Sequence, residues 1–170
     1  MSKKKTATRA RHTWLLKSEP AEFSFADLWQ AKNRTTSWGG VRNYQARNLL
    51  RDELTIGDRV LFYHSNADPS GIAGIGRVVR AGYPDPTQFE RGHAYHDPAS
   101  RPEAPRWFAV DVRAERALPS ILALEALRRE PLLEGMVLLR KGSRLSVQPV
   151  SPVEWRVIRE RAGFDPEDES

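Results

Sequence analysis

The sequence predicts a single α+β domain in which a small, curled mixed sheet is flanked by helices. Strand-like and helix-like segments are mixed along the chain without the βαβα rhythm of a parallel sheet. The run at 71–80 carries three glycines, which is typical of the bulged, sharply coiled strands of small barrels. The length of 170 residues and the 39% hydrophobic content suit one packed core.

The first two elements are predicted to be a strand and a helix. TWLLK at 13–17 is short and apolar and runs toward Pro20, which favours a strand over a helix. Ser24 and Asp27 have the spacing of a capping box, so a short helix is expected over 24–30.

A turn, a second helix and two strands are expected next. Residues 32–40 have turn chemistry, and Asn43 is placed to cap a helix over 44–53. The aromatic and β-branched run at 59–64 predicts a strand, and the glycine-bearing run at 71–80 predicts its neighbour.

The C-terminal half begins with an irregular excursion at 82–106, which holds five prolines. A strand is expected at 107–113, and an amphipathic helix at 118–129 that ends before Pro131. The alternating run at 144–150 predicts a strand. SPVE at 151–154 then supplies a cap, an N1 proline and an N3 acid for a last helix that ends near Arg161.

Charge divides the chain into a mildly basic domain at 13–163, a basic tail at 1–12 and an acidic tail at 164–170. This balance permits a polyanionic partner without requiring one. With no cysteine, disulfides, thiolate metal sites and cysteine nucleophiles are excluded. The chain lacks a secretory signal or a membrane-length apolar run, so we expect an intracellular protein with no membrane association. We expect it in the cytoplasm, with the nucleoid, or in the nucleus of a eukaryote.

The segment WGGVRNYQARN at 38–48 has the composition of a recognition surface. Aromatic rings stack on bases, amides read base edges and guanidiniums reach phosphates. The alternative is a capped helix whose tryptophan only fills the core.

The segment FYHSN at 62–66 places aromatic, imidazole and hydroxyl groups where a strand gives way to a loop, which is where pockets form. His64 and Ser65 should point to opposite faces, so His64 is poorly placed to act as a base for Ser65. Lys17 and Glu19 are either an acid/base pair or a structural ion pair.

Two further motifs do not support a cofactor or a metal. His93, His96 and Asp97 lie in a proline-rich loop that does not preorganise them as ligands. GIAGIG at 71–76 leads into a β-branched strand, so it lacks the helix N-terminus of a dinucleotide site. We expect no cofactor and no metal.

Several long blocks resemble EVE-domain proteins, and the resemblance covers about 13–160. The blocks are WLLKSEP at 14–20, WGGVRNYQARN at 38–48, GDRVLFYHSN at 57–66, GIAGIGRVV at 71–79, YPDPTQF at 83–89, PRWFAVDV at 105–112 and RLSVQPVSPVEW at 144–155. This resemblance implies a PUA-like pseudobarrel that binds nucleic acid, with modified cytosine as a ligand. It further implies a base pocket among Lys17, Glu19, Trp38, Val41, Arg42, Asn43, Tyr44, Arg47, Phe62, Tyr63, His64, Ser65, Arg144 and Ser146.

The leading hypothesis is a monomeric, non-enzymatic reader that holds one modified base of DNA or RNA and acts through an effector protein. A second hypothesis is an enzyme acting on a nucleobase or nucleotide, with Lys17, Glu19 and His64 as acid/base groups. A third is a protein-interaction module that uses the barrel surface.

Overall fold

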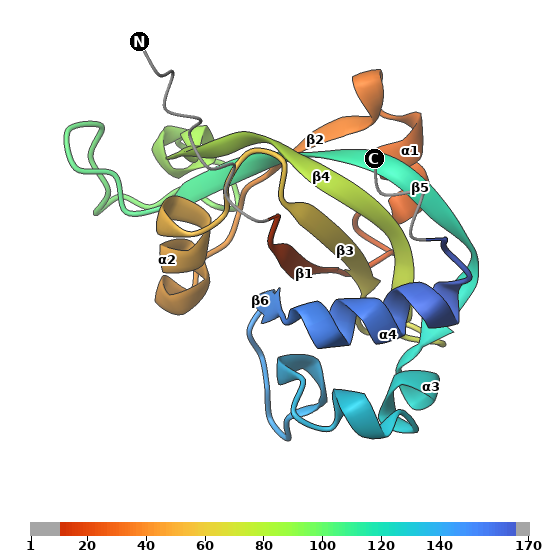
Figure 1. The fold of residues 1–170 in the computed structure, drawn as a ribbon. Helices are drawn as coiled ribbons and strands as arrows, with labels where there is room; N and C mark the ends of the chain where they lie inside the picture. Colours follow the sequence, from red (N-terminus) through yellow and green to blue (C-terminus); the bar gives the residue numbers. More distant parts are fainter. Residues whose placement is uncertain (1–10, 166–170) are drawn as a thin grey trace, which may run out of the picture.

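A six-stranded mixed sheet forms the centre of the protein, in the order β2-β5-β4-β3-β1-β6 (Figure 1). The computed structural model describes residues 11–165. Most of the expected basic tail and the last five residues of the acidic tail lie outside this range. Only β1 and β3 pair in parallel, and the other neighbours are antiparallel. The strands are β1 Thr13–Ser18, β2 Thr35–Trp38, β3 Arg59–His64, β4 Gly71–Pro84, β5 Phe108–Ala123 and β6 Val147–Val150.

In the part of the chain that the structure describes, four α-helices flank the sheet, and α4 crosses one face of it (Figure 1). The α-helices are α1 Phe25–Gln30, α2 Tyr44–Asp52, α3 Leu124–Arg128 and α4 Pro152–Ala162, and the 3-10 turns are η1 Lys32–Arg34, η2 Pro86–Phe89, η3 Pro131–Leu133 and η4 Val137–Leu139. The predicted caps are present, because Ser24 and Ser151 close capping boxes and the Asn43 side chain accepts from the N–H of Ala46. No helix within residues 11–165 is long and apolar enough to cross a membrane.

The sheet curls because its two longest strands, β4 and β5, pair with four shifts of register. Glycines permit the close approaches that this curvature needs. A Cβ on Gly74 would lie 2.3 Å from the Phe25 ring, and one on Gly76 would lie 2.6 Å from the Arg113 carbonyl oxygen. The expected curled, mixed sheet flanked by helices is confirmed, although the sheet does not close into a barrel.

Both faces of the sheet are covered by hydrophobic cores, and strand alternation divides the side chains between them. Val60 and Phe62 of β3 belong to the core shared with α1 and α2. Leu61 and Tyr63 belong to the core shared with α4. Phe164, expected at the start of the acidic tail, is buried in this second core.

The amphipathic helix expected at 118–129 is wrong for its first half. β5 continues to Ala123, where Leu122 pairs with Ile72, and α3 spans only Leu124–Arg128. The apolar residues at 118, 121 and 122 fit a helical face, and those at 118, 122 and 124 fit strand alternation, so the pattern alone does not decide between the two. The long partner strand β4 supplies ladder hydrogen bonds that a helix would leave unused.

The other element boundaries differ from the predicted ones by fewer residues. β2 occupies part of the expected turn at 32–40, β4 continues to Pro84, and β6 begins at Val147 rather than at 144.

Candidate nucleic-acid interface

A cavity of about 550 Å³ opens on the side of the sheet where several strands end. The carboxyl ends of the parallel strands β1 and β3 lie on this side, and the antiparallel β6 begins there. The cavity is lined by Lys17, Ser18, Glu19, Glu22, Phe23, Thr36, Ser37, Trp38, Gly39, Gly40, Val41, Arg42, Asn43, Ser65, Tyr95, Arg144 and Ser146.

The cavity lies at the seam of the curled sheet. β2 and β6 are opposite edge strands of the sheet order, yet Trp38 of β2 and Ser146, which leads into β6, line the same cavity. The curvature therefore brings the two edges around one space without a hydrogen-bonded closure.

Three aromatic side chains, Phe23, Trp38 and Tyr95, line the cavity, and the last two differ most in exposure. Trp38 is 8% exposed and rests edge-on against Phe62, with ring centroids 5.3 Å apart. Tyr95, from the proline-rich excursion, is 42% exposed. The Trp38 ring is thus fixed from behind by the core, while the Tyr95 ring presents much of its surface to a ligand.

Asp85 holds the loop between β2 and α2 in place. Its buried carboxylate accepts hydrogen bonds from the Gly40 N–H at 2.8 Å, Arg42 Nη1 at 3.0 Å, and the backbone N–H and hydroxyl of Thr87. Burial alone would raise the pKa of Asp85, but these hydrogen bonds together lower it below its ordinary value. The carboxylate is therefore a charged anchor.

Arg42 connects this anchor to Tyr95. Its Nη2 donates to the Tyr95 carbonyl oxygen at 2.6 Å, and its guanidinium lies 5.4 Å from the Tyr95 ring centroid. Gly40 has φ +75°, and a Cβ there would lie 2.6 Å from that ring. The Tyr95 ring thus packs against Gly40, and Arg42 fixes its backbone through the carbonyl oxygen.

The polar lining combines three cations, two carboxylates and several neutral groups, and Arg42 is already held by Asp85. Burial lowers the pKa of the Lys17 ammonium, which forms no ion pair among residues 11–165. Glu19 Oε1 accepts from the Asn66 amide at 2.6 Å, and the Ser18 hydroxyl donates to the Phe23 carbonyl. Lys17 is therefore the lining cation best placed to meet an acceptor on a ligand.

Comparison with known proteins identifies the family. The family model described as EVE domain matches residues 12–161. The chain belongs to the EVE domain family. Thymocyte nuclear protein 1 of Homo sapiens is 40% identical over 162 residues, which cover 85% of this chain and 71% of the relative.

Solved structures of similar sequence have the same fold. A hypothetical protein from Leishmania major is 42% identical with a TM-score of 0.84, over 94% of this chain and 98% of that one. Human THYN1 protein in complex with 5-methylcytosine containing DNA is 37% identical with a TM-score of 0.83, over 91% of this chain and 99% of that one. The resemblance predicted from the sequence blocks is confirmed.

The fold brings nine of the fourteen predicted site residues of this EVE domain to the cavity. These are Lys17, Glu19, Trp38, Val41, Arg42, Asn43, Ser65, Arg144 and Ser146. Their roles toward a base stay predictions.

The other five predicted residues lie outside the cavity lining. Phe62 is buried behind Trp38, and Tyr63 faces the opposite core. His64 accepts the Phe25 N–H at its Nε2, at 3.1 Å. Tyr44 stacks on Trp107 with centroids 4.9 Å apart, and Arg47 lies over the Tyr44 ring.

Sequence reasoning missed several lining residues of the EVE domain. They are Glu22, Phe23, Thr36, Ser37 and Tyr95, whereas Ser18, Gly39 and Gly40 lie within the predicted segments without being named as site residues. The glycine pair before Val41 was the available signal, because consecutive glycines permit a close approach of another chain segment. Tyr95 gave no such signal, since the excursion around it has no periodicity.

Of the groups weighed for catalysis and metal binding, His64, His93 and Asp97 lie outside the cavity lining, and each accepts a hydrogen bond. His64 is absent from the cavity lining, so the trio with Lys17 and Glu19 is not assembled there. In the HAYHD segment, His93 Nδ1 accepts the Tyr95 N–H, and the Asp97 carboxylate accepts the Trp107 indole N–H at 2.7 Å. The indole hydrogen bond is the main cause that lowers the pKa of Asp97.

Proposed function

We propose that this EVE-domain chain reads DNA by holding one modified cytosine, turned out of the duplex, in the seam cavity. The observation that carries the proposal is a space of about 550 Å³ that combines an exposed aromatic ring, a fixed indole and a half-buried ammonium. That volume lies within the roughly 300–1,000 Å³ of small-molecule sites. The relative whose crystal structure contains 5-methylcytosine DNA supports the choice of ligand.

The energetics require recognition of the modification itself. Turning a base out of the stack costs a few kcal/mol, and stacking on an aromatic ring returns about 1–3 kcal/mol. The remaining affinity must come from contacts to the base edge and from apolar contact with an added methyl group. The tryptophan and tyrosine walls offer the apolar surface, and the serines and Lys17 offer the polar contacts.

The proposal makes the chain a binding protein without chemistry of its own. Its effect in a cell then depends on a partner protein and on access to DNA, in a nucleoid or in a nucleus. We propose that the chain binds as a monomer, because one copy contributes all the lining residues named above.

Binding of the full chain to matched duplexes with cytosine or 5-methylcytosine at one position tests the proposal. We expect tighter binding of the methylated duplex. Tyr95→Ala should reduce the affinity for it about 5- to 150-fold, the equivalent of one lost stacking contact. Tyr44→Ala is the matched control, because Tyr44 is also exposed but stacks on Trp107 outside the cavity. Equal affinity of the wild-type chain for both duplexes would refute the proposal.

A further inference from the structure

Arginines occupy directly paired positions on three neighbouring strands. In the register of the sheet, Arg59 of β3 pairs with Arg77 of β4, and Arg77 pairs with Arg113 of β5. Paired residues share a face, and like charges directly opposite one another destabilise a sheet. The sheet therefore maintains an unfavourable row of positive charge, which calls for a compensating anion.

Part of this row is compensated within the protein. Arg59 donates to the Thr13 hydroxyl and lies over the Trp155 ring. Arg77 Nε pairs with Glu115 at 2.5 Å, and Glu115 also pairs with Arg11. Arg113 is exposed and has no ion pair among residues 11–165, so the row ends in a free guanidinium.

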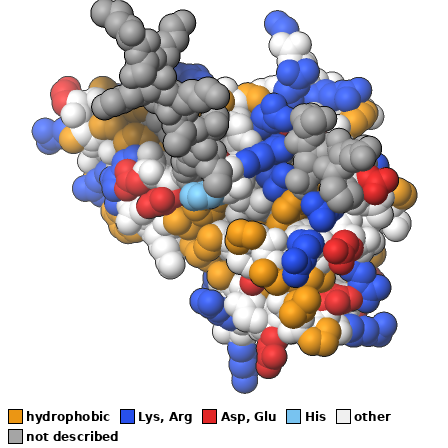
Figure 2. Space-filling view, in the orientation of Figure 1, with side chains coloured by type: hydrophobic (Ala, Val, Ile, Leu, Met, Phe, Trp, Pro, Cys, Tyr) orange, Lys and Arg blue, Asp and Glu red, His pale blue; other side chains and the backbone are white. Residues whose placement is uncertain are grey.

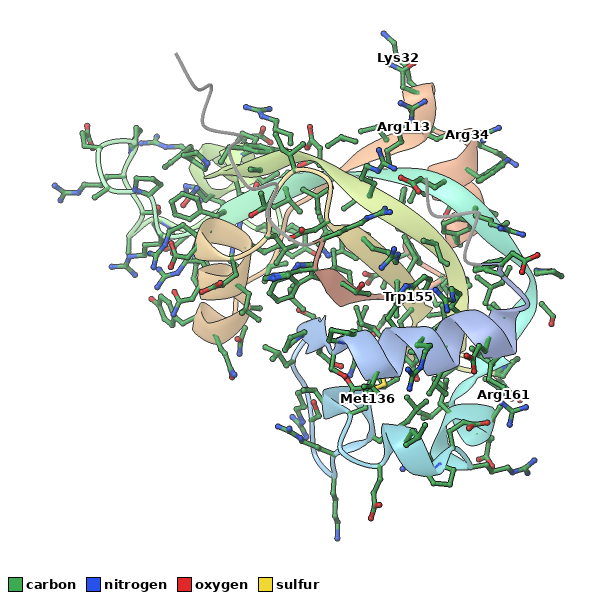
Figure 3. The ribbon with its side chains drawn as sticks, viewed as in Figure 1. Lys32, Arg34, Arg113, Met136, Trp155 and Arg161 are labelled. Atoms are coloured by element: carbon green, nitrogen blue, oxygen red, sulfur yellow. The ribbon has the colours of Figure 1, made fainter. Side chains whose placement is uncertain are left out.

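The uncompensated charge continues into the turn before β2. Arg113 pairs with Thr35, and η1, immediately before Thr35, contributes Lys32 and Arg34. Both side chains are exposed, and neither forms an ion pair within the described chain. Arg34 stacks on Trp29 at 3.7 Å, which holds its guanidinium at the surface. Figure 3 shows Lys32, Arg34 and Arg113 on the same side of the molecule, and Figure 2 shows Lys and Arg side chains gathered there.

We propose that Lys32, Arg34 and Arg113, here called the β2 basic edge, bind the phosphate backbone of the DNA that flanks the cavity. This inference rests on the proposed function. Trp38 lies four residues from Arg34, or roughly 13 Å along an extended strand. The strand that lines the cavity thus leads directly to the basic edge. Guanidinium groups suit phosphate because their planar fork donates two hydrogen bonds at once.

The salt dependence of DNA binding tests the basic edge. Log affinity falls as log salt concentration rises, and each phosphate contact adds about 0.9 to the magnitude of this negative slope. The slope values below are magnitudes. We expect the triple variant Lys32→Gln, Arg34→Gln, Arg113→Gln of the full chain to lower the slope by up to about 2.7. Its ratio of affinities for methylated and unmodified duplexes should match the wild-type ratio, because these residues are outside the cavity lining.

A matched triple variant, Arg128→Gln, Arg129→Gln, Arg156→Gln, removes three exposed arginines from α3, its C-cap and α4. It should leave the slope unchanged. A thermal melt checks folding, and Arg113→Gln alone, expected to lower the slope by about 0.9, replaces the triple variant if that unfolds. An unchanged slope in the folded basic-edge variants, or an equal loss in the control, overturns the inference. Failure of the proposed function is a separate result, because it appears as a wild-type chain that does not distinguish the two duplexes.

Discussion

Gly40 is the residue on which the position of the Tyr95 wall depends most directly. Gly40→Ala should lower the free energy of unfolding by about 1–2 kcal/mol, because an L residue at φ +75° is strained. It should also weaken binding of methylated DNA, since the added Cβ displaces the Tyr95 ring. Denaturant unfolding and duplex binding measure the two effects.

Gly92→Ala is the control for that substitution. Gly92 has φ +84°, and no atom of the described residues lies within 4 Å of an added Cβ, so an alanine there has the same kind of backbone strain without displacing a ring. We expect a similar loss of stability and unchanged DNA affinity. Equal binding by the Gly40→Ala and Gly92→Ala variants would show that Tyr95 does not contact the base.

Lys17 should make the affinity for DNA fall at alkaline pH. Its ammonium is fully present below its pKa and is lost as the pH rises through it, and burial lowers that pKa from the ordinary 10.5. The wild-type affinity should therefore fall at a lower pH than an ordinary lysine would give. Lys17→Arg keeps its charge over this range and should bind with a flatter profile. The same alkaline decline in both proteins, measured by titration at each pH, would assign the decline to another group.

At the scale of elements, Gly74 lets β4 pass close to α1. Gly74→Ala places a Cβ 2.3 Å from the Phe25 ring, which itself packs edge-on against Phe62. We expect a loss of about 1–3 kcal/mol in the free energy of unfolding, as for other overpacked cores. Gly135→Ala, with open space around the added Cβ, should be close to neutral in the same unfolding experiment. Comparable stability of the two variants would mean that β4 moves freely away from α1.

Elements bounded by local chemistry were predictable from the sequence. The caps at Ser24, Asn43 and Ser151 act within one helical turn, and the three helices that follow them begin as predicted. β2 and the extension of β5 were not predictable, because both depend on partners distant in sequence. Thr35 pairs with Arg113 and Leu122 with Ile72, and no local pattern encodes those pairings.

At the scale of the whole molecule, the candidate site was predictable in its segments but not in its side chains. The blocks around Lys17, Trp38 and Ser146 meet because the sheet curls, and the resemblance to a known family carried that information. Strand alternation separates Phe62 from Tyr63, and the proline-rich excursion delivers Tyr95 by its own irregular path. The sequence predicts that Phe62 and Tyr63 face opposite sides of the sheet, but it does not show which side meets the cavity or where the excursion places Tyr95.

The unclosed seam has a consequence for how ligand preference evolves. Within residues 11–165, β2 and β6 are not hydrogen-bonded neighbours, so the two sides of the cavity that they flank are joined through loops rather than through strand register. Substitutions or insertions in those loops can widen, narrow or recharge the binding space while every strand keeps its neighbours. One scaffold can in this way change its binding preference from one base to another without refolding.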